Sequence, residues 1–97
     1  MGDADASKCV RLRLEGRVQG VWFRAWTAEE AVKRGLRGWV RNRTDGSVEA
    51  QFCGPGTQVD AMVEACRRGP RHARVDGMIA APVEDDGAPG FRLLPTA

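Results

Sequence analysis

The stretch that decides the fold runs from residue 9 to residue 35 and reads CVRLRLEGRVQGVWFRAWTAEEAVKRG. Its first part, Cys9–Glu15, alternates apolar and charged side chains, which is typical of a strand with one buried face. The segment Gly16–Val21 interrupts the alternation with two glycines and predicts a loop. From about Phe23 the apolar residues follow a helical period, and Gly35 is placed to end that helix. The stretch therefore predicts a strand, a loop and a helix in succession.

The middle of the chain repeats this order after a hairpin. One strand is expected over Leu36–Asn42 and another from Val48 to Cys53, joined by a turn that contains Asp45-Gly46. We expect Thr57 to cap a second helix and Gly69-Pro70 to stop it. The apolar stripe of this helix has the spacing i, i+3, i+4, i+7 and consists of Val59, Met62, Val63 and Cys66.

Two more strands complete the expected set. One covers Val75 to Ala81, and a short edge strand at Phe91 and Leu93 precedes Pro95. The order is β-α-β-β-α-β plus a fifth strand, and right-handed crossovers place both helices on one face of the sheet. We therefore predict the α+β class and a ferredoxin-like two-layer sandwich. The first two strands run in the same direction, so the loop Gly16–Val21 and Asn42 should emerge at one edge of the sheet.

Length and charge limit what the chain can be. Its 97 residues suffice for one domain, and we expect a disordered N-terminal tail over residues 1–8 and a single domain over residues 9–97. The tail has no apolar run, so we expect neither a signal peptide nor a membrane anchor, and no stretch approaches membrane-spanning length. A net charge of +2 suits a small anionic ligand and falls short of the basic surface of a nucleic-acid binder.

The cysteines suggest a reduced protein. Cys9, Cys53 and Cys66 are odd in number, and no two form a C-x-x-C pair. We therefore expect free thiols, rather than a disulfide, and a cytoplasmic location. No metal site is expected, because His72 is the only histidine and no cluster of soft ligands accompanies it. We expect His72 to be structural or exposed on the surface.

The loop Gly16–Val21 and Arg24 form a candidate anion site. A glycine-flanked loop that leads into a helix can present backbone N–H groups to an anion, although a simple tight connection is the alternative. Arg24 favours the anion site because it lies in the first helical turn, where the macrodipole disfavours a cation by about 0.3–1 kcal/mol. The loop matches neither the P-loop nor the dinucleotide-binding pattern of glycines.

Asn42 is the second candidate residue. An amide at the end of a strand is usually a turn-former. Its expected place at the same edge as the loop nevertheless favours a role in the site. A neutral amide can both donate and accept hydrogen bonds, so Asn42 could orient a water molecule without changing its own protonation.

Two segments together closely resemble the acylphosphatase family: GRVQGVWFR at residues 16–24 and GWVRNRTDGSVEAQFCG at residues 38–54. GPRHARV at residues 69–75 is similar to a later segment of that family, and the likeness extends over residues 9–94. The resemblance implies a hydrolase of acyl phosphates in which Arg24 binds the phosphate and Asn42 orients the attacking water. It also implies a phosphate cradle made of the backbone amides of Arg17, Val18, Gln19, Gly20 and Val21.

The chemistry fits these residues. An acyl phosphate releases a carboxylate, which is a good leaving group, so catalysis depends on positioning and on charge stabilisation. We therefore expect direct attack by water with no phosphoenzyme, no metal and no cofactor. The expected partners are the acyl phosphate and inorganic phosphate, bound by a monomer with no nucleic-acid or membrane partner. Trp22 and Trp26 occupy positions that vary in the family, and the sequence leaves open whether they shape the acyl pocket or only pack.

Other classes of protein fit less well. An RNA-binding sheet needs exposed aromatic residues on its central strands, whereas the outward positions here hold Arg11, Arg13, Glu49 and Gln51. A metal chaperone would need a C-x-x-C loop. A non-catalytic sensor of anions stays open, and turnover would distinguish it. Related domains of larger maturation proteins handle carbamoyl phosphate, but we expect no further domain here.

Overall fold

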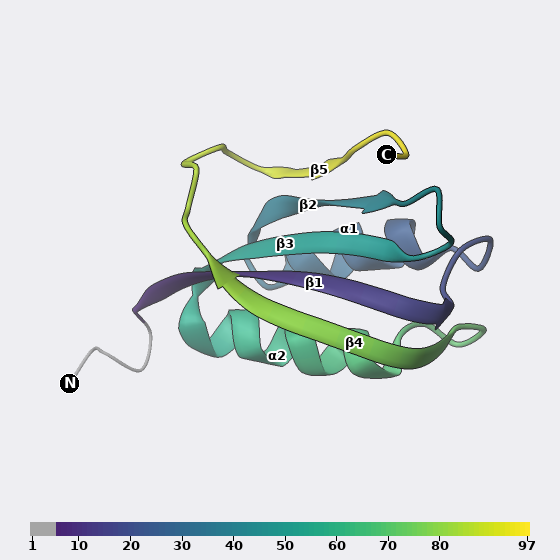
Figure 1. The fold of residues 1–97 in the computed structure, drawn as a ribbon. Coiled ribbons are helices and arrows are strands. Elements are labelled where there is room, and N and C mark those ends of the chain that lie inside the picture. Colours follow the sequence, from purple (N-terminus) through teal and green to yellow (C-terminus); the bar gives the residue numbers. More distant parts are fainter. Residues whose placement is uncertain (1–5) are drawn as a thin grey trace.

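The computed structural model describes residues 6–97 and contains one five-stranded sheet with two helices. Figure 1 shows both helices packed against the same face of the sheet. The predicted α+β class and the ferredoxin-like two-layer sandwich are therefore confirmed. The elements in chain order are β1 (Ser7–Arg17), α1 (Phe23–Lys33), β2 (Arg37–Asn42), β3 (Val48–Pro55), α2 (Gly56–Arg68), β4 (Arg74–Val83) and β5 (Phe91–Leu93).

The strands lie in the order β4-β1-β3-β2-β5. Strand β1 pairs antiparallel with both β3 and β4, and β2 pairs antiparallel with β3. Strand β5 pairs parallel with β2, so that Val40 lies opposite Leu93. Because β1 and β2 run in the same direction on either side of β3, the loop after β1 and the turn after β2 emerge at the same end of the sheet, on the right of Figure 1.

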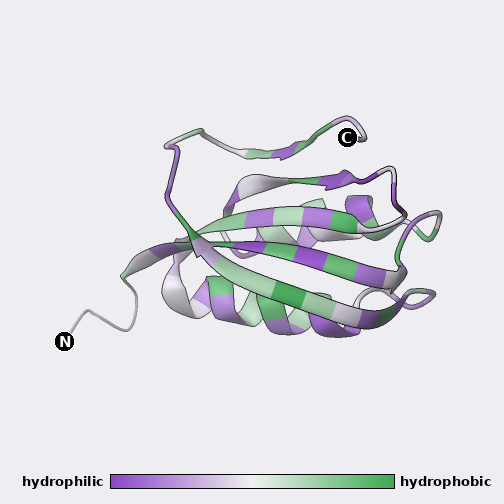
Figure 2. Cartoon of the chain, in the orientation of Figure 1, coloured by the Kyte–Doolittle hydropathy of each residue, from purple (hydrophilic) through white to green (hydrophobic). Residues whose placement is uncertain are grey.

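The core lies between the sheet and the helices. Alternate residues of β1, Leu12 and Leu14, are fully buried there, and Figure 2 shows the matching alternation of hydropathy along the strand. The stripe predicted on α2 also faces this core, since Val59, Met62 and Cys66 are fully buried. The fold thus holds its loops on two rigid layers.

The ends of the helices follow the expected signals at three of four positions. After α1, Gly35 has a φ of 70°, and the Leu36 N–H donates to the Ala31 carbonyl at 2.9 Å, as in a Schellman motif. Helix α2 ends at Arg68 before Gly69, as predicted. The expected cap at Thr57 is wrong: α2 already begins at Gly56.

Helix α2 begins without a side-chain cap. Pro55 occupies the N-cap position, with a φ of −56° and a ψ of 133°. The backbone supplies an acceptor instead, because the Gly56 N–H donates to the Ala6 carbonyl at 3.0 Å. Thr57 therefore lies inside the first turn.

The expectation of three free thiols is wrong. Cys9 and Cys53 form a disulfide, and only Cys66 is a free cysteine among the described residues. The two bonded residues lie directly opposite each other on β1 and β3, with their Cα atoms 4.1 Å apart. This spacing is typical of the closer type of antiparallel pair. The strand register therefore brings together two cysteines that lie 44 positions apart in the sequence.

The N-terminal boundary also differs from the expectation. Strand β1 begins at Ser7, so Ser7 and Lys8 belong to the sheet rather than to a tail. The rest of the expected tail falls largely on residues 1–5, which lie outside the described residues. Within residues 6–97, neither helix has the length and apolar character needed to cross a membrane.

Candidate active site

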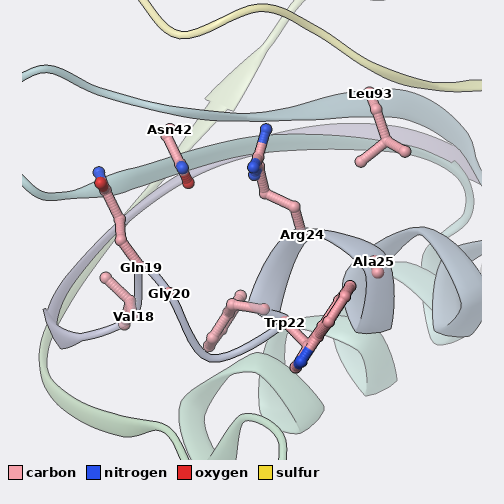
Figure 3. A pocket seen from close by; sticks show the side chains of 9 residues that line it. Val18, Gln19, Gly20, Trp22, Arg24, Ala25, Asn42 and Leu93 are labelled. Atoms are coloured by element: carbon pink, nitrogen blue, oxygen red, sulfur yellow. The ribbon is translucent and has the colours of Figure 1, made fainter.

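A cavity of about 450 Å³ opens where the β1–α1 loop meets the end of β2 (Figure 3). This confirms that the loop and Asn42 meet at one edge of the sheet. Arg17 is the last residue of β1 and Val21 lies within the loop, and neither residue lines the cavity. The lining residues are Val18, Gln19, Gly20, Trp22, Phe23, Arg24, Ala25, Asn42 and Leu93.

The loop between β1 and α1 keeps its backbone donors free. Val18 and Val21 are only 1% and 8% exposed, so their side chains anchor the loop in the core. The backbone N–H groups of Gln19, Gly20 and Val21 donate no hydrogen bond to any residue of the described chain. Gly20 has a φ of 74°, which is a conformation that glycine adopts readily. Free N–H groups beside a helix N-terminus favour an anion.

The side chain of Gln19 ties this loop to the next part of the site. Its Nε2 atom donates to the backbone carbonyls of Arg43 and Ser47, each at 2.8 Å. These two carbonyls belong to the turn between β2 and β3, which directly follows Asn42. Gln19 therefore fixes the loop relative to the strand end that carries the asparagine. The resemblance to the family implied a role for the backbone of Gln19 only, and nothing in the sequence pattern indicated this bridge.

Arg24 lies in the first turn of α1 and is exposed. Figure 3 shows its side chain extending from the helix towards β2 and Asn42. Among residues 6–97 it has neither an ion pair nor a hydrogen bond through its guanidinium group. The cavity therefore carries one positive charge that the described part of the protein does not neutralise, next to the positive end of a helix.

Asn42 is the last residue of β2, and its side chain points into the same cavity. Its Oδ1 atom is shielded and accepts no hydrogen bond from a described residue. A shielded acceptor without a partner is unusual, because it costs about 1–3 kcal/mol. The Asn42 carbonyl accepts from the Ala97 N–H at 3.0 Å, which fixes the backbone here. Asn42 thus keeps an unused acceptor at a residue that lines the cavity.

Three lining residues had no signal in the sequence: Phe23, Ala25 and Leu93. Leu93 reaches the cavity because β5 pairs with β2, a pairing that the sequence did not specify. The sequence left the roles of two tryptophans open. Trp22 lines the cavity and is 82% exposed, whereas Trp26 does not line the cavity. Trp26 packs edge-on against Phe23, with ring centroids 5.5 Å apart.

The remaining chemical candidates lie elsewhere. His72 is exposed in the connection between α2 and β4. The described chain has one cluster of possible metal ligands, formed by Cys9, Cys53 and Asp85. Its two sulfur atoms are bonded to each other in the disulfide and are therefore not thiolate ligands. Burial raises the pKa of the Cys66 thiol to about 12, so this residue is a poor nucleophile near neutral pH.

The open face of the sheet does carry one aromatic residue that the sequence analysis overlooked. Trp39 lies on this face but is only 7% exposed. The guanidinium groups of Arg11 and Arg41 cover its ring, at 5.3 and 4.9 Å from the centroid. A base could therefore stack on this ring only after displacing an arginine, which disfavours an RNA-binding platform.

Comparison with known proteins gives a consistent result. The family model for acylphosphatase matches residues 10–93. The chain is 53% identical over 89 residues to an acylphosphatase of Rhodospirillum rubrum, covering 92% of this chain and 98% of that protein. It is 51% identical over 86 residues to an acylphosphatase of Rhizorhabdus wittichii, covering 89% of this chain and 87% of that protein.

Solved structures agree. An acylphosphatase from Coxiella burnetii matches with a TM-score of 0.87 and 30% identity, over 91% of this chain and 93% of that chain. The acylphosphatase from Bacillus subtilis matches with a TM-score of 0.86 and 37% identity, over 89% of this chain and 97% of that chain. The fold, the two sequence segments and these relatives lead to one conclusion: the chain belongs to the acylphosphatase family.

Proposed function

We propose that this protein hydrolyses the carboxyl–phosphate bond of acyl phosphates to a carboxylate and inorganic phosphate. Membership of the acylphosphatase family supports the reaction. The observation that carries the mechanism is the pairing of two unsatisfied groups in one cavity. The guanidinium of Arg24 and the Oδ1 atom of Asn42 both lack partners among the described residues, and both residues line the same cavity.

The phosphate binds between the loop and Arg24 in this proposal. The backbone amides of residues 17–21 donate to the phosphate oxygens, and those of Gln19, Gly20 and Val21 have no competing acceptor in the described chain. Arg24 supplies the full positive charge, and the start of α1 supplies a partial one. These fixed donors stabilise the charge that spreads over the equatorial oxygens in the transition state.

Asn42 places the attacking water. Its Oδ1 accepts a hydrogen bond from the water, which fixes the oxygen in line with the bond to be broken. A new P–O bond forms from the water oxygen, and the bond from phosphorus to the acyl oxygen breaks. The electron pair of that bond leaves on the carboxylate, and the protons of the water stay with the released phosphate. No covalent enzyme intermediate is formed.

We also propose that the reaction needs no metal and no cofactor. Arg24 and the loop amides supply the charge stabilisation that a magnesium ion gives in other phosphoryl transfers. The donor set supports this, because the described residues around the cavity include no carboxylate, histidine or cysteine.

Hydrolysis of benzoyl phosphate in excess EDTA tests the activity, followed by the loss of ultraviolet absorbance of the substrate. Turnover in the presence of EDTA is expected. Phosphate binding without turnover would instead favour a non-catalytic sensor.

The same reaction in ¹⁸O-labelled water tests which atom the water attacks. Attack at phosphorus places the label in inorganic phosphate, whereas label in benzoate would exclude attack at phosphorus. A trapped phosphoenzyme would exclude direct attack by water.

Two substitutions separate the proposed roles. Arg24→Ala should raise KM by roughly 10- to 100-fold, which corresponds to the loss of a charged hydrogen bond. Asn42→Ala should mainly lower kcat. Arg68→Ala is a matched control, because Arg68 is also an exposed arginine without an ion pair in the described chain. Equal losses in KM and kcat for both site variants would contradict this division of roles.

Three further expectations stay predictions. They are a cytoplasmic location, a monomeric state and the absence of a nucleic-acid partner. Size-exclusion chromatography with light scattering tests the monomeric state. A titration with labelled RNA at low salt tests the absence of a nucleic-acid partner.

A further inference from the structure

The cavity has a polar half and an apolar half. Gln19, Arg24 and Asn42 bring hydrogen-bonding groups to one side, which is the left and centre of Figure 3. Trp22, Ala25 and Leu93 lie on the other side. The total volume of about 450 Å³ has room for roughly 15 water molecules, so a phosphate group fills only part of it. The remaining space lies against the apolar side.

Trp22 is the most unusual residue of the apolar half. It is the only non-glycine residue with a positive φ among residues 6–97, with a φ of 64°. It is also 82% exposed, so its indole gains little from packing in the fold. Neither the backbone conformation nor the exposure favours folding. Both make sense if the indole becomes buried when a ligand binds, because strained conformations persist where function needs them.

Leu93 completes the wall from another element. It is 56% exposed on β5, and Figure 3 shows its side chain pointing from the strand towards Ala25 and the helix. The alanine leaves the gap between these two larger side chains unfilled. An apolar group that entered this gap would remove surface from both Trp22 and Leu93, and large apolar side chains exposed together commonly mark a binding site.

We propose that Trp22 and Leu93 form the acyl-binding wall of the site, and that the enzyme prefers acyl phosphates with a bulky apolar or aromatic acyl group. The inference rests on the proposed function, because Arg24 must hold the phosphate for the acyl group to reach the wall. Of the three side chains on the apolar side, only Trp22 has a hydrogen-bonding group, its indole N–H, and none is charged. A charged acyl group would therefore lose its hydration there without gaining an ion-pair partner.

The test compares kcat/KM for benzoyl phosphate and acetyl phosphate in each variant. The ratio of the two values cancels any general damage to the phosphate site. Trp22→Gly should lower the benzoyl-to-acetyl ratio about tenfold, and Leu93→Ala about threefold. Val32→Ala is the matched control, because Val32 is 65% exposed on α1 but does not line the cavity, and its ratio should stay within twofold of the wild type.

Glycine is chosen at position 22 so that the variant still folds. A φ of 64° is readily adopted by glycine, so the melting temperature of Trp22→Gly should not fall. An unchanged ratio in both Trp22→Gly and Leu93→Ala would overturn the proposal. Equal losses for both substrates would also overturn it, because they would mean that Trp22 only shapes the phosphate loop.

A binding measurement separates this proposal from the proposed reaction. Benzylphosphonate and methylphosphonate carry the same anionic group and cannot be hydrolysed. Calorimetry should show at least tenfold tighter binding of benzylphosphonate to the wild type, and Trp22→Gly should abolish this preference. Equal affinities in the wild type would refute the wall even if the enzyme turns over. A preference without turnover would support the wall and refute the hydrolase.

Discussion

Reduction of the Cys9–Cys53 disulfide should strongly destabilise the protein. The bond closes a loop between residues 44 positions apart. In the chain-entropy relation, a loop of this length restricts the unfolded state by about 4 kcal/mol at 25 °C. For a domain of this size, the same loss corresponds to a fall in melting temperature of roughly 15–30 °C.

The assay compares oxidised and reduced wild-type protein by urea unfolding. Reduction changes no side chain other than the bonded pair, so packing around Cys66 is the same in both forms. Because Cys9 and Cys53 are only 5% and 2% exposed, complete reduction requires unfolding in denaturant followed by refolding with reductant present. The oxidised form should also have the smaller m-value, because its unfolded state is more compact.

Thiol counting provides the control for this comparison. Denatured protein without reductant should show one reactive thiol, from Cys66, and reduced protein should show three. For the double variant Cys9→Ala/Cys53→Ala, the thiol count and the urea unfolding curve should be the same with and without reductant. Three thiols before reduction would show that the bond is absent. A difference below about 1 kcal/mol between intact and reduced forms would refute the reasoning from loop length.

Three other perturbations test particular contacts. Gln19→Ala should lower the free energy of unfolding by roughly 1–3 kcal/mol and reduce kcat, since it removes two hydrogen bonds to the β2–β3 turn, whose carbonyls at Arg43 and Ser47 keep only their backbone donors; unchanged urea unfolding would disprove the bridge. The Arg37 guanidinium lowers the pKa of Asp85 from 3.8 to about 2. In acid-unfolding curves, the wild type should therefore be more stable than Asp85→Asn above about pH 4, and this advantage should be lost as the pH falls towards 2. Gly38→Ala should destabilise by about 3 kcal/mol, because a Cβ atom at a φ of 140° would overlap a carbonyl of β3, whereas calorimetry of Gly46→Ala should show a smaller loss because no atom lies near that Cβ.

Most of the fold was predictable because its signals are local. The alternation along β1 and the helical stripe of α2 depend on residues that are close in sequence, and both patterns were confirmed. The meeting of the loop and Asn42 followed from strand direction alone. Pairings between distant elements were harder to foresee. Strand β5 has three residues, and no local pattern specifies that it lies parallel to β2.

The disulfide illustrates a signal that was present but not used. Cys9 lies on the same outward face of β1 as Arg11, and Cys53 lies on the same outward face of β3 as Gln51. A ferredoxin-like sheet places these two strands side by side and antiparallel. Counting cysteines and their spacing along the chain misses this arrangement, because the register of the sheet decides which side chains meet.

Details of the site depended on conformations that the sequence pattern does not encode. The left-handed backbone of Trp22 has no sequence signature, since such conformations favour glycine. The bridge from Gln19 to the β2–β3 turn and the unpartnered oxygen of Asn42 arise from distances between elements. The residue types at the site were therefore predictable, whereas their supporting contacts required the structure.

Two of the three tryptophans give this small protein separate optical reporters. Trp22 is 82% exposed at the cavity, whereas Trp39 is 7% exposed between two arginines on the opposite face of the sheet. Iodide should quench the fluorescence of Trp22 readily and that of Trp39 poorly. A ligand in the cavity would shift the emission of the first, and loss of the sheet would shift the emission of the second. Emission spectra of single-tryptophan variants could thus follow binding and unfolding as separate signals without an added dye.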